Sequence, residues 1–176
     1  MSLRAARRAD EEYGCGAQPD WRRVDWKAAT QRIEIGGRLV NVVSLGAGEG
    51  PPVVFIHGLG GCWQNWLENL PAVALHRRVV ALDLPGFGEF EMPEGDVSIT
   101  NYAACVELCE HLELGEVVVV GNSMGGFSAG ERAIRHPQRV ERLVLDENGH
   151  VPMLERPGAF NRALLGFLAE EDSVTP

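Results

Sequence analysis

Residues 117–126 read VVVVGNSMGG. Four consecutive valines predict a strand that is buried on both faces, and a helical pattern begins at Met124. Gly121, Ser123 and Gly125 lie between them in the G-x-S-x-G pattern of a nucleophile elbow, a sharp turn that leaves the serine strained at its apex. Side chains at the two glycines would collide with neighbouring elements. The pattern favours Ser123 as an exposed nucleophile over an ordinary serine in a glycine-rich turn.

The composition is that of one acidic globular domain. The chain has 176 residues, of which 45% are hydrophobic, and 25 acidic against 16 basic residues give a net charge of −9. This charge argues against nucleic acid or an anionic membrane as a partner. The four cysteines, at positions 15, 62, 105 and 109, show no metal-ligand spacing. No apolar segment suggests a signal peptide or a membrane span, so we expect a reduced, cytoplasmic protein without a metal or cofactor.

Strands and helices alternate along the chain. Further strands are predicted at residues 32–35, 38–45, 53–56, 78–82 and 140–145. Helices are predicted at residues 62–75, with a break near Pro71, at 98–112, where Cys105 and Cys109 share the inner face, and at 160–169. Residues 1–20 are polar and dotted with glycine, so we expect a loose arm before a single domain at residues 21–176, with Trp21 and Trp26 attaching the arm to the domain.

This alternation predicts an α/β fold with a mostly parallel sheet and helices on both faces. Ligands bind such sheets at the carboxyl ends of the strands. Two glycine-containing loops, HGLGG at residues 57–61 and DLPGFG at residues 83–88, directly follow predicted strands, as Ser123 does. We therefore expect the three segments to meet at one rim.

These three motifs, in this order and spacing, resemble the α/β-hydrolase fold family. The nearest branch contains cap-bearing esterases and carbon–carbon hydrolases, and cofactor-free haloperoxidase-like enzymes are close to it. Residues 149–157, leading into Phe160, resemble the family segment that carries the catalytic histidine and the closing helix. The resemblance covers about residues 33–169.

One part of the family pattern is missing. In the family a cap domain follows the strand after the elbow helix, and a strand bearing the catalytic acid comes later. Here the predicted strand at residues 140–145 leads through Asp146 to His150 within a few residues. The chain thus resembles a family member shortened on its C-terminal side, without a cap domain and without the usual acid-bearing strand.

The resemblance implies Ser123 as nucleophile and His150 as its general base, because a serine hydroxyl attacks well only when a base removes its proton. It also nominates the backbone N–H groups of Leu59 and Met124 as the oxyanion hole, which stabilises the developing negative charge. His57 is expected to shape this loop rather than to remove protons.

The identity of the catalytic acid is an open question at this point. Asp146 follows a strand that should neighbour the elbow strand, which would bring it close to Ser123. Glu147 is the second choice. Asp83 is expected to be structural, ordering the loop that contains Pro85 and Gly86.

Two further expectations follow from the shortened pattern. Residues 143–145 would form an apolar edge strand, which invites pairing with a second copy into a homodimer or larger assembly. Loss of the cap would leave an open apolar pocket. Its candidate wall residues are Trp63, Trp66, Phe87 and Phe127, although Trp66 is better explained as a core residue.

The sequence as a whole predicts a serine hydrolase that cleaves small carboxylic esters through an acyl-enzyme. One alternative is perhydrolase or haloperoxidase-like chemistry without a cofactor, in which peroxide replaces water. The other is a catalytically silent binding or assembly module.

Overall fold

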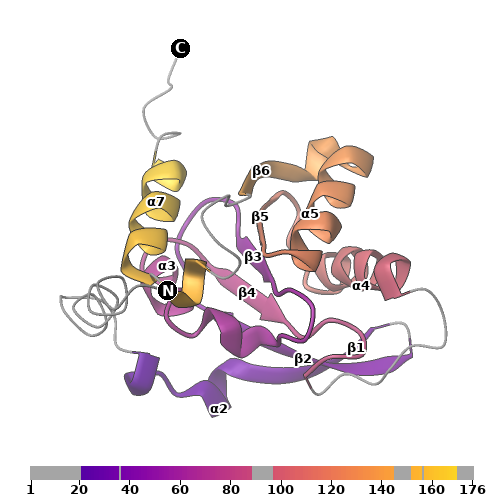
Figure 1. Ribbon diagram of the computed structural model, residues 1–176, viewed down its shortest axis with the longest axis horizontal. Helices are drawn as coiled ribbons and strands as arrows, with labels where there is room; N and C mark the ends of the chain where they lie inside the picture. The colour runs from indigo at the N-terminus through magenta and orange to yellow at the C-terminus, as the bar shows by residue number, and fades with distance from the viewer. Residues whose placement is uncertain (1–20, 36, 89–96, 145–151, 156, 170–176) are drawn as a thin grey trace, which may run out of the picture.

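The computed structural model describes residues 21–35, 37–88, 97–144, 152–155 and 157–169 (Figure 1). Within them lies a six-stranded sheet with the order β1-β2-β4-β3-β5-β6. The strands are β1 (Thr30–Ile35), β2 (Arg38–Leu45), β3 (Val53–Ile56), β4 (Val79–Leu82), β5 (Val117–Gly121) and β6 (Val140–Val144). The last four are mutually parallel, whereas β1 and β2 are antiparallel. The predicted α/β fold with a mostly parallel sheet is confirmed.

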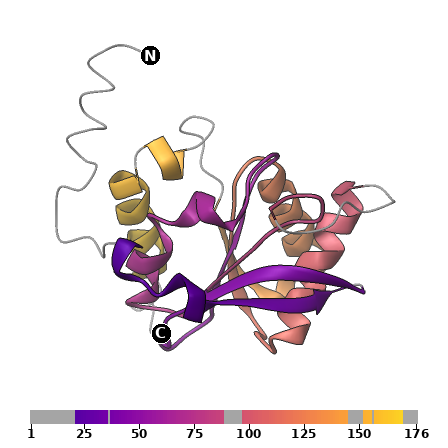
Figure 2. The same cartoon turned by 90° about the horizontal axis from the view of Figure 1, so that it is seen from below.

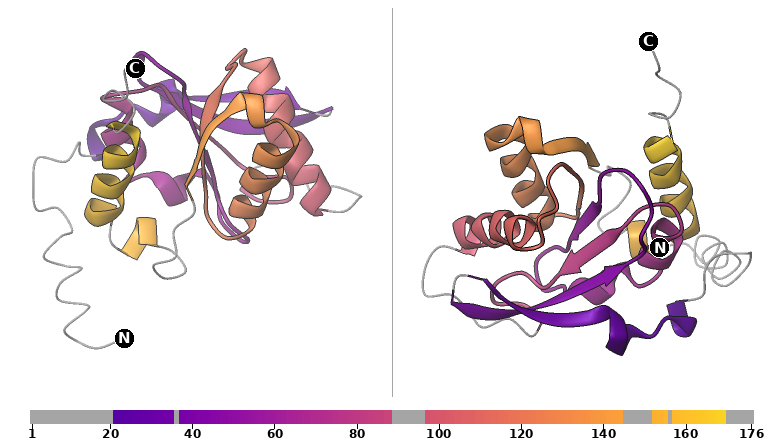
Figure 3. Two further views of the ribbon diagram at one scale, coloured as in Figure 1. Left: turned by 90° about the horizontal axis from the view of Figure 1, so that it is seen from above. Right: turned by 180° about the vertical axis from the view of Figure 1, so that it is seen from behind.

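Helices cover both faces of this sheet (Figures 1 and 3). One face carries α4 (Val97–His111) and α5 (Met124–Arg135). The other carries η2 (Trp63–Trp66), α3 (Leu70–Ala74), α6 (Pro152–Glu155) and α7 (Pro157–Ala169). Three short helices connect these elements to the strands: η1 (Trp21–Arg23), α2 (Trp26–Ala29) and η3 (Pro137–Arg139). The last helix therefore lies across the sheet from the elbow helix.

The core follows from the valine-rich strands. Every residue of β3 and β4, and the first four of β5, are buried, because helices cover both sides of these strands. Cys105 and Cys109 are buried on the inner face of α4, as their spacing predicts. Burial raises the pKa of both thiols, so they behave as small apolar residues.

The hairpin of β1 and β2 forms where residues 36–37 predicted it, with Ile35 paired to Arg38 (Figure 2). The predicted helix at residues 62–75 is instead two short ones, η2 and α3, and the break precedes Pro71. α7 begins at Pro157, earlier than the predicted Phe160. Both corrections have one cause: proline is tolerated in the first turn of a helix, where it begins the helix rather than breaking it.

Trp21 and Trp26 attach the start of the described chain to the domain. Trp21 Nε1 donates a hydrogen bond to Glu68 Oε1 at 2.5 Å, and Trp26 Nε1 donates to the carbonyl of Trp21 at 2.8 Å. The ring of Trp26 packs against Trp63 with centroids 5.2 Å apart. The expected arm, residues 1–20, lies outside the described residues. None of the described helices is both long and apolar enough to cross a membrane.

Candidate active site

The pairing register of the parallel strands brings three loops together. Ile56 of β3 is paired with Leu82 of β4 on one side and with Gly121 of β5 on the other. The residues that follow, including His57 and Asp83, therefore emerge side by side at the carboxyl edge of the sheet. The predicted meeting of the three motifs at one rim is confirmed, and it is the ligand-binding edge of folds of this type.

Ser123 sits at this rim in a strained conformation. Its φ of 50° and ψ of −116° lie in a region that residues with a side chain rarely adopt. It is the N-cap of α5, yet its side chain makes no capping hydrogen bond and is exposed to solvent. The turn thus presents the hydroxyl at the positive end of a helix rather than using it to stabilise that helix.

The two glycines of the elbow are required by space. A Cβ at Gly121 would lie 2.5 Å from the carbonyl oxygen of Gly125, and a Cβ at Gly125 would collide with the carbonyl oxygen of Ile56. Real Cβ atoms do not approach a backbone oxygen so closely. The tight packing of α5 against β3 and β5 therefore depends on both glycines, as the motif predicts.

The loop after β3 lies against the elbow. A Cβ on Gly58 would be 3.1 Å from Ser123 Cβ and 2.8 Å from the Asn122 side-chain oxygen, so only a glycine lets the two segments approach. Leu59 follows immediately and has a side chain that is 74% exposed. Met124 is the first residue of α5. The two predicted oxyanion-hole residues thus flank Ser123, one in each segment.

His57 is fully buried and uses both ring nitrogens. The backbone N–H of Leu84 donates to His57 Nε2 at 2.8 Å, so this nitrogen carries no proton. The proton is then on Nδ1, which donates to the Gly58 carbonyl at 2.7 Å. Burial lowers the pKa of His57, which keeps the ring neutral. His57 therefore joins two loops of the rim and leaves no nitrogen to act as a base.

Asp83 is a second buried polar group that orders the rim. Its Oδ1 accepts a hydrogen bond from the backbone N–H of Trp63 at 2.8 Å. Gly88, with a φ of +59°, folds so closely over the carboxylate that a Cβ there would collide with it. The carboxylate thereby connects the start of η2 to the loop after β4, which agrees with the structural role expected for it.

His150, Asp146 and Glu147 lie outside the described residues. The elements on either side of them are placed. β6 ends at Val144, whose partner Val120 precedes Gly121, and α6 begins at Pro152. Among the residues that the structure does describe, no cluster of three or more His, Cys, Asp or Glu could hold a metal ion.

The C-terminal helices are held against η2 and α3. Phe160 packs on Trp66 with ring centroids 5.9 Å apart. Asn161 accepts a hydrogen bond from Asn69 Nδ2 at 2.8 Å and donates one to the Glu68 carbonyl, also at 2.8 Å. Sequence reasoning missed Asn161 as an anchor. Its signal is a polar residue on the otherwise apolar inner face of a helix, where a buried amide needs partners.

The four aromatic candidates for a pocket wall have different fates. Trp63 and Trp66 are 6% and 1% exposed and belong to the core, so Trp63 does not line an open pocket. Phe87 is partly buried and meets His57 edge-on, with centroids 5.9 Å apart. Phe127 is 81% exposed, one helical turn from Ser123. Only Phe87 and Phe127 lie where substrate near Ser123 would meet them.

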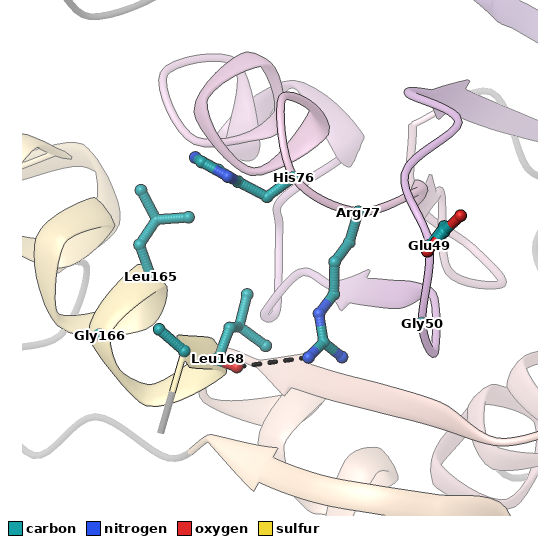
Figure 4. Close-up of a pocket in the computed structure, with 8 residues that line it drawn as sticks. Glu49, Gly50, His76, Arg77, Leu165, Gly166 and Leu168 are labelled. Carbon is teal, nitrogen blue, oxygen red and sulfur yellow. Dashed lines mark hydrogen bonds between the residues drawn. The ribbon is translucent and has the colours of Figure 1, made fainter. Parts of the chain in front are cut away.

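A cavity of about 770 Å³ lies at the opposite edge of the sheet (Figure 4). It is lined by residues that precede β3 and β4, such as Gly50 and Arg77, and by the end of α7. Arg77 crosses its wall and donates to the carbonyls of Pro51 and Leu168, at 3.5 and 3.3 Å. Because Ser123 lies at the carboxyl end of β5, this cavity is separate from the catalytic rim.

Comparison with known proteins agrees with this geometry. Residues 51–170 match the α/β hydrolase fold family. The chain is 42% identical over 115 residues to 2-hydroxy-6-oxo-2,4-heptadienoate hydrolase of Pseudomonas putida, covering 62% of this chain and 41% of that protein. It is 43% identical over 119 residues to the dihydrolipoyllysine-residue acetyltransferase component of an acetoin cleaving system, also from Pseudomonas putida, covering 66% and 32%.

A solved structure is similar over the same part of the chain. The meta-cleavage product hydrolase from Pseudomonas fluorescens IP01 superposes with a TM-score of 0.60 at 34% identity, covering 65% of this chain and 43% of that one. The matches thus span less than half of each of these relatives. The elbow at Ser123, the His57 loop and the family match over residues 51–170 lead to one conclusion: the chain belongs to the α/β-hydrolase fold family.

Proposed function

We propose that this protein is a serine hydrolase that cleaves small carboxylic esters through an acyl-enzyme. The observation that carries the proposal is Ser123: its strained φ of 50°, its exposure and its place at the start of α5 together present a hydroxyl rather than stabilise a turn. Strain of this kind persists where the surrounding structure enforces it, and it is concentrated at functional sites.

In the proposed reaction, the Ser123 oxygen attacks the ester carbonyl while His150 takes the hydroxyl proton. The N–H groups of Leu59 and Met124 hold the oxyanion, and both residues flank Ser123. The tetrahedral intermediate collapses, the C–O bond to the alcohol breaks, and His150 returns its proton to the leaving oxygen. Water then repeats the sequence on the acyl-enzyme, releasing the acid and restoring Ser123.

Asp146 is proposed to orient His150 and to stabilise its charged form. The placed flanks support this assignment, because β6 ends beside β5 and so delivers the following residues near the elbow. Glu147 remains the second candidate. His57 and Asp83 are excluded from these roles, since each is buried and committed to hydrogen bonds within the rim.

A second substrate class is carbon–carbon bonds next to a ketone. The relative from Pseudomonas putida named above, which is 42% identical, is a 2-hydroxy-6-oxo-2,4-heptadienoate hydrolase. We place esters first because an alkoxide that receives a proton leaves more readily than a carbanion, which the enzyme must stabilise further. An exposed serine with few enclosing groups therefore suits the easier leaving group.

The test is pre-steady-state kinetics with p-nitrophenyl acetate. The proposal predicts a burst of p-nitrophenol close to one equivalent per chain, followed by slower turnover, and neither in Ser123→Ala. Ser44→Ala, which removes a hydroxyl from β2, is the matched control and should retain both. A folded wild-type chain without a burst or turnover would indicate a silent binding module. Release that depends on added peroxide would indicate perhydrolase chemistry.

A further inference from the structure

The outer face of α5 carries two large apolar side chains in water. Phe127 is 81% exposed and Ile134 is 77% exposed. They are seven residues apart, so they lie on the same side of the helix two turns from each other. Gly130 lies between them, and the space that its Cβ would occupy is open. We call Phe127, Gly130 and Ile134 the α5 stripe.

The neighbouring edge of the sheet is also open. β6 is the last strand in the order of the described sheet and is paired only with β5, in parallel. Its outer edge therefore presents backbone N–H and C=O groups without a strand partner from the described part of the chain. Such an edge is a template for another strand.

We propose that the β6 edge and the α5 stripe together form an interface between two copies of this chain. The two β6 strands would pair antiparallel about a two-fold axis perpendicular to the sheet, extending it to twelve strands across the dimer. The same axis makes the two α5 helices antiparallel, so that Phe127 of each copy faces Ile134 of the other.

The spacing of the elements agrees with this arrangement. Strands pair about 4.8 Å apart, so a helix above β5 and β6 would lie roughly 5 to 7 Å from the axis. The two α5 helices would then be roughly 10 to 14 Å apart, compared with the 8 to 10 Å typical of packed helices. Gly130 at the crossing permits the shorter distance, while Phe127 and Ile134 fill the ends of the gap.

The surface fits a second copy better than a strongly charged partner. The α5 stripe has a large residue at each end and a glycine in the middle, so it is complementary to itself under a two-fold axis. Glu131 and Arg135 form an ion pair of 2.7 Å along this exposed face, so each sign of charge is represented once. The patch is therefore close to neutral, although the chain carries a charge of −9. Two short strands and one helix face make a small interface, with a Kd on the order of micromolar.

Sedimentation velocity from about 1 to 200 µM tests the proposal, over the range in which a micromolar dimer forms. The wild-type chain should shift from monomer to dimer. Ile134→Glu should weaken association at least about tenfold, because it buries two carboxylates against Phe127. Leu75→Glu is the matched control: Leu75 is also an exposed apolar residue, 69% exposed, but it lies at the end of α3 on the other face. It should leave the dimer intact.

Gly130→Leu separates assembly from folding. A better helix former in open space should raise the thermal stability of the monomer, while its side chain separates the two helices and weakens the dimer. Hydrogen exchange should also slow in residues 140–144 as concentration rises. A wild-type chain that stays monomeric throughout, or a dimer that survives Ile134→Glu, overturns the proposal.

Discussion

Two regions of this protein treat their side chains in opposite ways. At the catalytic rim, Ser123 is strained and exposed, and its side chain does not cap α5. Across the sheet, Phe160 and Asn161 of α7 are buried, and every polar contact of Asn161 described above is directed at η2 or α3. The first region holds a reactive group at a cost in stability, and the second contributes the stability. Substitutions should therefore separate activity from folding.

The largest effect is expected at Ser123. Ser123→Ala and Ser123→Gly both remove the hydroxyl, so each should reduce ester turnover by at least about a thousandfold. They should differ in stability. Glycine adopts positive φ without strain, so Ser123→Gly should raise the free energy of unfolding by about 1 kcal/mol over Ser123→Ala. Steady-state kinetics and urea unfolding measure the two effects. Equal stability of the two variants would remove strain from the account.

Asp146→Asn should come next, with a fall in kcat/KM at neutral pH of at least about a hundredfold, on the order of 3 kcal/mol in barrier. The amide keeps the shape but loses the negative charge that stabilises a protonated His150. Turnover should partly recover at high pH, and Glu147→Gln should have little effect. If Glu147→Gln is the damaging change instead, the acid is one residue further on.

A pair of phenylalanines tests the comparison itself. Phe160→Ala should lower the free energy of unfolding by about 3 kcal/mol, because it leaves a cavity beside Trp66. Phe127→Ala removes the same atoms from an exposed position and should change stability of the monomer by less than about 0.5 kcal/mol. Urea unfolding at low protein concentration measures both. Similar losses in the two variants would contradict the division between rim and α7.

The smallest effect concerns pH. His57 has a lowered pKa in the folded protein, so the unfolded chain binds its proton first as the pH falls. Stability from this residue should be complete above the ordinary histidine pKa of about 6.5 and should decline below it, by at most about 1.4 kcal/mol per pH unit. His57→Gln should flatten this slope between pH 7 and pH 5 in urea unfolding. An unchanged slope would assign the acid sensitivity to other groups.

Local patterns were sufficient for much of the fold. The four valines of β5 and the glycines around Ser123 predicted strand, turn and helix, because a sharp elbow depends on residues adjacent in sequence. The convergence of three loops followed from the general behaviour of parallel strands. The helix boundaries at Pro71 and Pro157 were predicted wrongly, since a proline inside a first turn and a proline that breaks a helix have similar local sequences.

Long-range contacts account for what the sequence did not predict. The tautomer of His57 is set by the N–H of Leu84, 27 residues away. Trp63 is buried because Trp26 and the C-terminal helices pack near it, whereas Phe127 is exposed because no described element covers that side of α5. Identical residue types thus differ in burial according to neighbours that are distant in the chain.

The central claim is that Ser123 is an activated nucleophile, and a fluorophosphonate tests it most directly. This reagent phosphonylates a serine whose proton is being removed, with loss of fluoride. Incubation with the folded protein, followed by peptide mass spectrometry, should place a single adduct on Ser123, and none should form after denaturation. An adduct on another serine, or no adduct on the folded chain, would contradict the account.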